Sequence, residues 1–427
     1  MSLITQQQAF SSVFIAHGEA LAKSEGLCVD TVTRALNAGT MVLLGNPSHT
    51  GLEPLLVGQP SRIKINANIG TSPMRENVHD EMEKLSVALA AGADTIMDLS
   101  IAGDLAAIRR KMLDACARPI GTVPLYAVAQ KYIDAGKDPA MFSAEELFEE
   151  IEAQAEQGVD FMTVHCGITE RGARWATEEG ARIMGIVSRG GSILARWMRT
   201  HHKENPLLAG YHRILDIAVK HNVTLSLGDG LRPGAGMDAG DAAQWEEVVL
   251  LGRLAKQGRE SGVQCMVEGP GHVPLQEVEA QIRGIKTATA GAPLYVLGPL
   301  VIDAGPGYDH IAGAIGGAVA VCAGADFLCY LTPAEHLTLP DKEDVRIGVV
   351  ASRVAAHAGE VALGRPMALG REKAMSLSRK NLDWKEMQRV ALDPAMVCAK
   401  RGTHAHEEVC AMCGEFCAVK MLRIEGS

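Results

Sequence analysis

Short apolar runs that end in glycine or polar residues alternate with amphipathic helical stretches from residue 63 onward, and this alternation restricts the fold more than any other feature. Strands separated by helices at this spacing pair in parallel through right-handed crossovers. We therefore expect a (β/α)8 barrel of the TIM type, with a doubly wound sheet as the alternative. Nine runs are one too many for eight strands, so at least one is an extra strand or a loop. The runs cover residues 63–70, 94–100, 120–126, 161–167, 184–190, 224–230, 264–271, 294–300 and 327–333.

Polar side chains stand at the C-terminal ends of most of these runs. In a barrel, the loops after the strands build the active site at that end, so this pattern favours the barrel over the doubly wound sheet. Tyr295 breaks the pattern because it stands at the start of its run. The residues that conform to the pattern are Asn68, Asp98, Tyr126, His165, Arg189, Asp229 and Glu268.

The segments on either side of the predicted barrel, residues 61–364, lack this alternation. We expect residues 1–60 to be helical, with a loop at LLGNPSHTG, and to cover one end of the barrel. Residues 365–427 are expected to form a helical C-terminal segment. Residues 312–331 are apolar but are interrupted by Asp326, which favours a buried helix that runs into a strand over a membrane span.

The composition limits which binding partners and which cellular compartment are expected. The net charge is −10 and no block of consecutive Lys or Arg occurs, so no surface is marked for nucleic acid or anionic lipid. No basic region followed by an uninterrupted apolar stretch begins the chain, so we expect no signal peptide and a cytoplasmic protein. In that compartment, ten cysteines favour metal binding or catalysis over disulfides. The scattered cysteines, expected to be small buried hydrophobic residues, are Cys28, Cys116, Cys322, Cys329 and Cys398.

Three cysteines lie close together near the C-terminus. Cys410, Cys413 and Cys417 put three thiolates on one loop, which suits an iron–sulfur cluster or zinc. Structural zinc would need a fourth ligand, for which His404 and His406 are the candidates. A 4Fe-4S cluster held by three thiolates would leave one iron open to a substrate or cofactor. The spacing of the three cysteines alone fits both a zinc site and a 4Fe-4S cluster.

Two glycine-rich stretches and two histidines follow strands. VSRGG (187–191) and GDGLRPG (228–234) each place an Arg beside flexible glycines, where backbone N–H groups and guanidinium can bind an anion. Together they predict a phosphorylated ligand. His272 and His336 follow different strands and could bind one metal through neutral imidazole. Two histidines without a carboxylate signature are more often ordinary polar residues.

These motifs, in this order, resemble the phosphomethylpyrimidine synthase (ThiC) family of radical S-adenosylmethionine (SAM) enzymes. The resemblance implies a (β/α)8 barrel and a 4Fe-4S cluster on Cys410, Cys413 and Cys417, whose open iron binds SAM. The reduced cluster splits SAM to methionine and a 5′-deoxyadenosyl radical, which abstracts hydrogen from 5-aminoimidazole ribotide (AIR) and starts its rearrangement. The matching stretches are NANIGTS, MDLS, IGTVPLY, VHCG, GIVSRGGS, SLGDGLRPG, VEGPGHVPL, LGPL, GYDH, LCYLTPAEHL and CAMCGEFC.

The same resemblance implies further site residues and partners. His272 and His336 match a second metal site, usually assigned to zinc. The resemblance also implies an electron donor and a homodimer in which the C-terminal cluster segment closes over a barrel. The cysteine spacing of two and three residues is shorter than in many members but matches the short forms. The implied AIR contacts are Asn68, Met97, Tyr126, His165, Ser188, Arg189, Gly190, Asp229, Gly230, Leu231, Arg232, Glu268 and Tyr295.

Two stretches depart from the family pattern, and they guide the expected product. Residues 302–310 of this chain are Ile-Asp-Ala-Gly-Pro-Gly-Tyr-Asp-His, where the family usually has Thr-Asp-Ile-Ala-Pro-Gly-Tyr-Asp-His. Residues 43–46 are Leu-Leu-Gly-Asn, where the family usually has Ile-Pro-Ala-Asn. Smaller side chains and a relaxed φ would reshape a wall beside the barrel mouth while the AIR contacts stay intact. We therefore expect the 5-hydroxybenzimidazole synthase branch of cobamide biosynthesis. The alternatives are hydroxymethylpyrimidine phosphate for thiamine and, in another class, a phosphate-binding barrel with a structural zinc tail.

Overall fold

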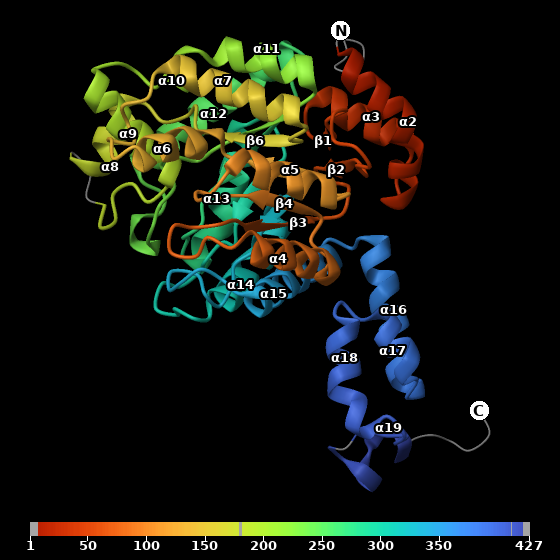
Figure 1. Cartoon of the computed structure of the whole chain (residues 1–427). Coiled ribbons are helices and arrows are strands. Elements are labelled where there is room, and N and C mark those ends of the chain that lie inside the picture. Colours follow the sequence, from red (N-terminus) through yellow and green to blue (C-terminus); the bar gives the residue numbers. More distant parts are fainter. Residues whose placement is uncertain (1–6, 179–181, 411, 422–427) are drawn as a thin grey trace. The chain divides into compact units, whose positions relative to one another are not determined.

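The computed structural model describes residues 7–178, 182–410 and 412–421 (Figure 1). The chain divides into two compact units, Met1–Gly359 and Glu360–Ser427. The first unit contains a closed barrel and the segment that precedes it. The second unit is helical in its described part and carries the three clustered cysteines.

Eight parallel strands close the barrel in the order β10-β3-β4-β5-β6-β7-β8-β9. Because β10 pairs with β3, the sheet has no free edge, so the predicted (β/α)8 barrel is confirmed and the doubly wound alternative is wrong. The strands are β3 (Lys64–Ile69), β4 (Thr95–Asp98), β5 (Ile120–Thr122), β6 (Phe161–Val164), β7 (Thr224–Leu227), β8 (Cys265–Gly269), β9 (Leu294–Leu297) and β10 (Phe327–Cys329).

The surplus run is 184–190, which forms no strand. Ser188 instead caps helix α9 (Arg189–His201), its hydroxyl accepting the N–H of Gly191 at 3.1 Å. Ile186 packs against the barrel core, which explains the apolar pattern. Periodicity cannot distinguish such a short apolar run from a strand.

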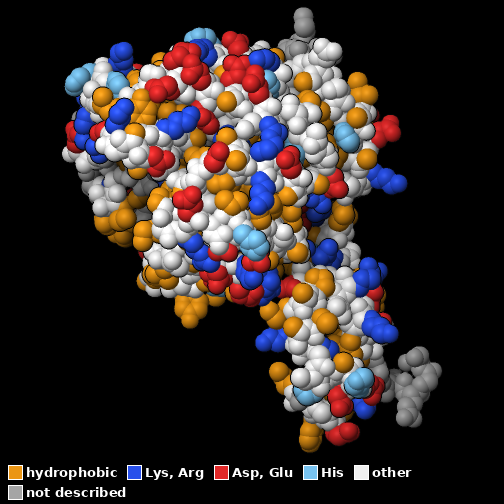
Figure 2. All heavy atoms as spheres, viewed as in Figure 1, with side chains coloured by type: hydrophobic (Ala, Val, Ile, Leu, Met, Phe, Trp, Pro, Cys, Tyr) orange, Lys and Arg blue, Asp and Glu red, His pale blue; other side chains and the backbone are white. Residues whose placement is uncertain are grey.

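Helices connect the strands and cover the outside of the barrel, and their outer faces carry mixed acidic and basic side chains on the side shown in Figure 2. Helix α7 shows how the sequence sets their ends: Ser143 and Glu146 form the predicted capping box, and Gly158 at φ 108° ends the helix. The helices are α4 (Val78–Ala91), α5 (Leu105–Ala115), α6 (Pro124–Asp134), α7 (Ala144–Gln157), α8 (Glu170–Thr177), α9, α10 (Pro206–Ala209), α11 (Tyr211–His221), α12 (Ala242–Glu260), α13 (Leu275–Ala288), α14 (Asp309–Ala323) and α15 (Lys342–Ala362).

The apolar stretch 312–331 forms the end of α14 and strand β10, as expected. Throughout residues 7–178, 182–410 and 412–421, every helix is too short or too polar to cross a bilayer. Cys116 and Cys329 are buried, as predicted. The same prediction is wrong for Cys28, Cys322 and Cys398, which are exposed.

The N-terminal segment covers the N-terminal end of the barrel, as expected. Helices α2 (Gln8–Ser24) and α3 (Val29–Ala38) precede an antiparallel pair, β1 (Val42–Leu44) and β2 (Leu55–Val57), which the sequence analysis missed. Strands of three residues are too short to show a period.

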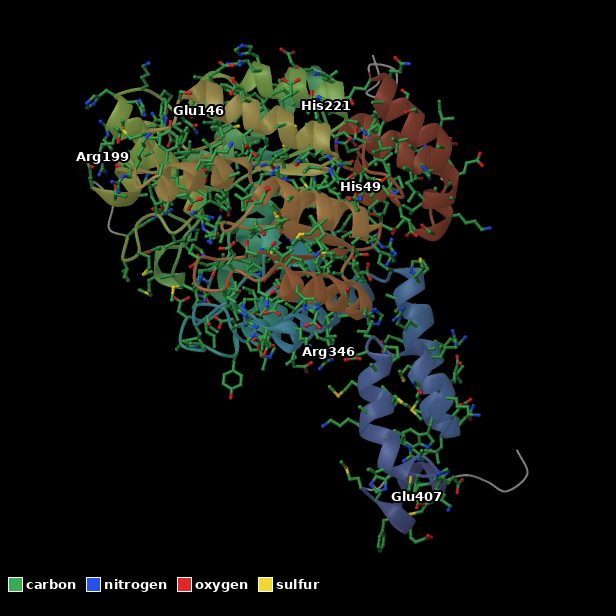
Figure 3. All side chains as sticks on the ribbon, in the orientation of Figure 1. His49, Glu146, Arg199, His221, Arg346 and Glu407 are labelled. Atoms are coloured by element: carbon green, nitrogen blue, oxygen red, sulfur yellow. The ribbon has the colours of Figure 1, made fainter. Side chains whose placement is uncertain are left out.

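Hydrogen bonds attach this segment to the residues that precede the barrel strands. The Leu43 N–H donates to the side chain of Gln264, just before β8, at 2.6 Å. Just before β6, Asp160 accepts from the Asn46 N–H at 2.9 Å and pairs with His49 at 2.7 Å (Figure 3). Residues 43–49 therefore close the end of the barrel opposite the strand C-termini.

The second unit begins within α15, a few residues before the predicted boundary at 364 and 365. Its helices are α16 (Pro366–Asn381), α17 (Trp384–Val390), α18 (Pro394–Arg401) and α19 (Ala418–Met421). The cysteine motif lies between α18 and α19, on a loop that contains a 3-10 turn, Gly414–Phe416.

Candidate active site

A cavity of about 520 Å³ opens at the C-terminal ends of the barrel strands. Tyr295, which broke the strand-end pattern, lies inside the barrel, where its ring stacks on Phe327 with centroids 4.3 Å apart. Its hydroxyl accepts a hydrogen bond from Asn66 at 2.8 Å. Eight of the implied AIR contacts line this cavity: Asn68, Met97, Tyr126, His165, Asp229, Arg232, Glu268 and Tyr295.

The other five implied contacts, Ser188, Arg189, Gly190, Gly230 and Leu231, belong to the two glycine-rich stretches. The stretches lie against each other so closely that a Cβ on Gly191 would meet the carbonyl oxygen of Gly230 at 2.1 Å. Only glycine permits such an approach of backbone to backbone. The structure therefore brings both predicted anion-binding stretches to one side of the cavity.

Arg189 and Leu231 show how these stretches present their polar groups. The Arg189 guanidinium lies over the Tyr126 ring, 4.8 Å from its centroid. The Leu231 N–H donates to the buried carboxyl of Glu247 at 2.7 Å, so this N–H is not free to bind a phosphate as the sequence analysis expected. Arg189, Arg232 and the N-terminus of α9 remain as positively polarised groups on this side of the cavity.

Burial sets the protonation of two groups in the cavity. Burial raises the pKa of Asp229 to about 8, against the opposing charge of Arg232, with which it pairs at 2.9 Å. Burial, with the positive charge of Arg232, lowers the pKa of His165 to about 3, so its imidazole is neutral. Within the described residues, His165 Nδ1 and Asp229 Oδ2 are buried without a hydrogen-bond partner. Such groups are costly unless a ligand satisfies them.

Two hydroxyl groups that the sequence analysis missed hold Glu268. Thr163 Oγ1 and Ser226 Oγ donate to Glu268 Oε1 at 2.7 and 3.0 Å. They stand side by side on β6 and β7, where Thr163 is in register with Ser226. Both are in mid-strand, so their inward direction could be assigned only once the strand register was known.

Asn66 is a third residue that the sequence analysis missed. Its amide donates to Asn68 Oδ1 at 2.7 Å as well as to Tyr295, and its own Oδ1 accepts from the Thr95 hydroxyl at 2.8 Å. Asn68 in turn donates to Cys329 Sγ at 3.1 Å. This buried network fixes two of the implied AIR contacts.

A second cavity, of about 870 Å³, adjoins the first and shares Asn68 with it. Arg189, Glu335 and His336 also line it, together with Lys84, which is buried and forms an ion pair with Glu81 at 2.7 Å. Burial raises the pKa of Glu335. The two cavities share Asn68, Leu99 and Leu297 in their linings, so they lie side by side at the barrel mouth.

His272 and His336 come together, as predicted, with ring centroids 5.3 Å apart. The carboxylates absent from the sequence pattern come from the loop between β9 and α14 and from the first residue of α14. His272 Nδ1 donates to Asp303 Oδ1 at 2.7 Å, and His336 Nδ1 donates to Asp309 Oδ1 at 3.1 Å. Paired imidazoles with this outer carboxylate shell fit a divalent metal.

The cysteine motif can be tested against its two candidate metals. Cys413 is exposed, Cys417 is buried and Cys410 is intermediate. Thiolates that share one zinc at about 2.3 Å lie within about 4.6 Å of one another. Among the described residues, the three sulfurs belong to no group of metal-binding atoms that all lie within 4.8 Å of one another. Three thiolates on one short loop are also a donor set for a 4Fe-4S cluster in which one iron is left open.

A closed (β/α)8 barrel with a buried polar cavity at its strand C-termini defines an enzyme for a small, polar ligand. The sequence model of the Radical SAM ThiC family matches residues 5–424, and the chain belongs to this family. It is therefore a radical SAM enzyme, and membership implies a 4Fe-4S cluster, SAM, a substrate and an electron donor.

Curated relatives match along nearly the whole chain. A phosphomethylpyrimidine synthase of Desulforamulus reducens is 49% identical over 405 residues, covering 94% of this chain and 93% of the relative. One of Thermoanaerobacter pseudethanolicus is 46% identical over 418 residues, covering 97% and 96%. Among solved structures, a dihydropteroate synthase of Xanthomonas albilineans is 12% identical with a TM-score of 0.44, covering 76% of this chain and 100% of that one. That structural likeness carries no argument about function.

Proposed function

We propose that this enzyme rearranges 5-aminoimidazole ribotide to hydroxymethylpyrimidine phosphate for thiamine biosynthesis. The observation that carries the substrate is the convergence of eight implied AIR contacts on one cavity. The relatives that support the product are named phosphomethylpyrimidine synthases and cover nearly the whole chain. They favour the alternative product over the 5-hydroxybenzimidazole that we expected from residues 43–46 and 302–310.

The positions of these two stretches weaken the argument for 5-hydroxybenzimidazole. Residues 43–46 lie at the closed N-terminal end of the barrel, where Leu43 and Asn46 bind the residues before β8 and β6. Ala304 and Gly305 are not among the residues that line the AIR cavity. A Cβ on Gly305 would meet only Ile302, at 3.5 Å or beyond, so no tight wall was loosened there.

The residues of the cavity support a ribotide as its ligand. Arg189, Arg232 and the N-terminus of α9 offer positive charge and N–H groups to a phosphate. Neutral His165 can accept a hydrogen bond at its unpartnered Nδ1. Asp229, with a pKa of about 8, can hold or release a proton near neutral pH, as a rearrangement with proton transfers requires.

Cys410, Cys413 and Cys417 would hold the 4Fe-4S cluster, which when bound and reduced would supply the electron for cleavage of SAM. The barrel contributes a site that protects the reactive product of this cleavage from water. Leu99, Val123 and Val296 line the AIR cavity between the polar groups. Adjoining cavities allow AIR and the adenosyl group to lie side by side, which supports direct hydrogen abstraction.

The second metal, the homodimer and the cytoplasmic location stay predictions. For the second metal we propose zinc, held by His272 and His336. An electron donor is needed to reduce the cluster, and the chain does not identify it.

Cys413→Ala tests the radical assignment, with Cys398→Ala as the matched control because Cys398 is also an exposed cysteine of the second unit. Wild-type and Cys398→Ala protein, purified anaerobically, should be brown, hold about four irons per chain and cleave SAM. Cys413→Ala should lose iron and SAM cleavage while it still binds AIR, because the AIR cavity lies entirely in the first unit. A colourless wild-type protein with one zinc at the cysteines would instead establish the phosphate-binding barrel with a structural tail.

A further inference from the structure

We propose that Asp303, from the loop between β9 and α14, and Asp309, the first residue of α14, position His272 and His336 as ligands and thereby set the affinity of the second metal. Each carboxylate accepts the Nδ1–H of one imidazole, at 2.7 and 3.1 Å. A carboxylate at Nδ1 fixes the tautomer whose Nε2 lone pair binds a metal, and it raises the basicity of that nitrogen. The inference rests on the metal site proposed above and assigns what controls it.

Both carboxylates are themselves held in place. Asp303 Oδ2 accepts the backbone N–H of Gly236, from the loop after β7, at 2.7 Å. Asp309 lies in the first turn of α14, is buried, and accepts the N–H of Gly307 at 3.2 Å. Each aspartate therefore uses one oxygen for its own support and the other for a histidine. The segment 303–309, which leads into α14, thus orients imidazoles that come from two other loops.

The two imidazoles lie close enough to be ligands of one metal. Their ring centroids are 5.3 Å apart, and each Nδ1–H is already used by a carboxylate, which leaves Nε2 of each ring as the nitrogen available to a metal. His336 also has a φ of 59°, a left-handed conformation that costs free energy in a residue with a side chain.

The site has open coordination positions. Within the part of the chain that the structure describes, no third metal-binding side chain completes a group of three with these histidines. His336 also lines the second cavity. A metal with only two protein ligands beside a cavity is of the open kind, which binds a small molecule, and not of the closed structural kind.

Zinc affinity measured without turnover tests this inference. The cluster-loaded holoenzyme, in which the motif cysteines are occupied, is stripped of other divalent metal and titrated with Zn²⁺ against a chelating dye. Asp303→Asn and Asp309→Asn should each bind zinc 10- to 100-fold more weakly, the usual cost of losing such an outer partner. His272→Ala should lose the site. Asp114→Asn, an exposed aspartate of α5, should bind like the wild type.

Nitrogen NMR of labelled histidine gives a second readout, since the wild type should show both rings protonated at Nδ1 and the Asn variants should lose this uniform state. Asp303 is partly exposed, so Asp303→Asn keeps the test valid if Asp309→Asn folds poorly. Wild-type affinity in Asp303→Asn overturns the inference. Because zinc is titrated without AIR or SAM, that result would leave the proposed reaction standing. A wild type that makes no pyrimidine would overturn the reaction alone.

Discussion

One methyl group at position 190 should abolish tight AIR binding without unfolding the barrel. An ideal Cβ on Gly190 would lie 2.3 Å from Cε1 and 2.4 Å from Nδ1 of His165, where ordinary contacts begin at 3.4 Å. The ring, or the first turn of α9, would have to move by about 1 Å, which would displace His165 relative to the other groups of the cavity. A misplacement of about 1 Å in an active site costs on the order of 100-fold in rate.

The Gly190→Ala measurement combines AIR binding by calorimetry, turnover and circular dichroism. We expect the helix content to stay unchanged, AIR affinity and kcat/KM to fall by roughly 100-fold, and the iron content to be that of the wild type. Gly370→Ala is the matched control, because Gly370 lies in α16 with no atom within 4 Å of the added Cβ. Wild-type AIR affinity in Gly190→Ala would refute the reasoning that His165 and the glycine-rich stretches form one rigid wall.

Two further predictions concern Glu268 and the closed end of the barrel. Thr163→Val removes a hydrogen bond to Glu268 worth about 1.5–3 kcal/mol, so kcat/KM should fall roughly 10- to 150-fold. Thr163→Ser keeps the hydroxyl and should stay active. Equal losses of kcat/KM in both variants would contradict a role for the hydroxyl. Burial lowers the pKa of His49, but the hydrogen bond and charge of Asp160 outweigh burial and raise the pKa above 6.5. The free energy of unfolding that the wild type gains over His49→Gln should therefore be full at about pH 5.5 and shrink as the pH rises toward about 9 through that raised pKa. Urea unfolding at both pH values checks this, and a difference that grows with pH would be inconsistent with a charged His49.

The barrel could be predicted because its signal is repeated along the chain. Each strand ends in a polar or glycine residue, and helix ends such as the capping box at Ser143 depend only on neighbouring residues. The run 184–190 was wrongly considered as a strand, because its apolar residues belong to a loop that packs on the core. The pair β1 and β2 was missed because three-residue strands carry no period.

Eight of the thirteen AIR contacts implied by motif line one cavity, but the residues that support them were not predictable from local sequence. Thr163 and Glu268 are 105 residues apart, and only the closed barrel brings them to 2.7 Å. Asp303 and His272 lie on different loops, and only the folded barrel brings their side chains into contact. Residues 43–46 were misplaced beside the barrel mouth for the same reason, since the sequence does not say which end a preceding segment covers.

Anaerobic incubation of the full chain with AIR, SAM and a reductant, followed by mass spectrometry of the product, tests the central claim most directly. The account predicts hydroxymethylpyrimidine phosphate, together with methionine and 5′-deoxyadenosine, and predicts that Cys413→Ala forms none of them. A fluorescent benzimidazole without phosphate as the product, or pyrimidine formed by Cys413→Ala, would contradict it.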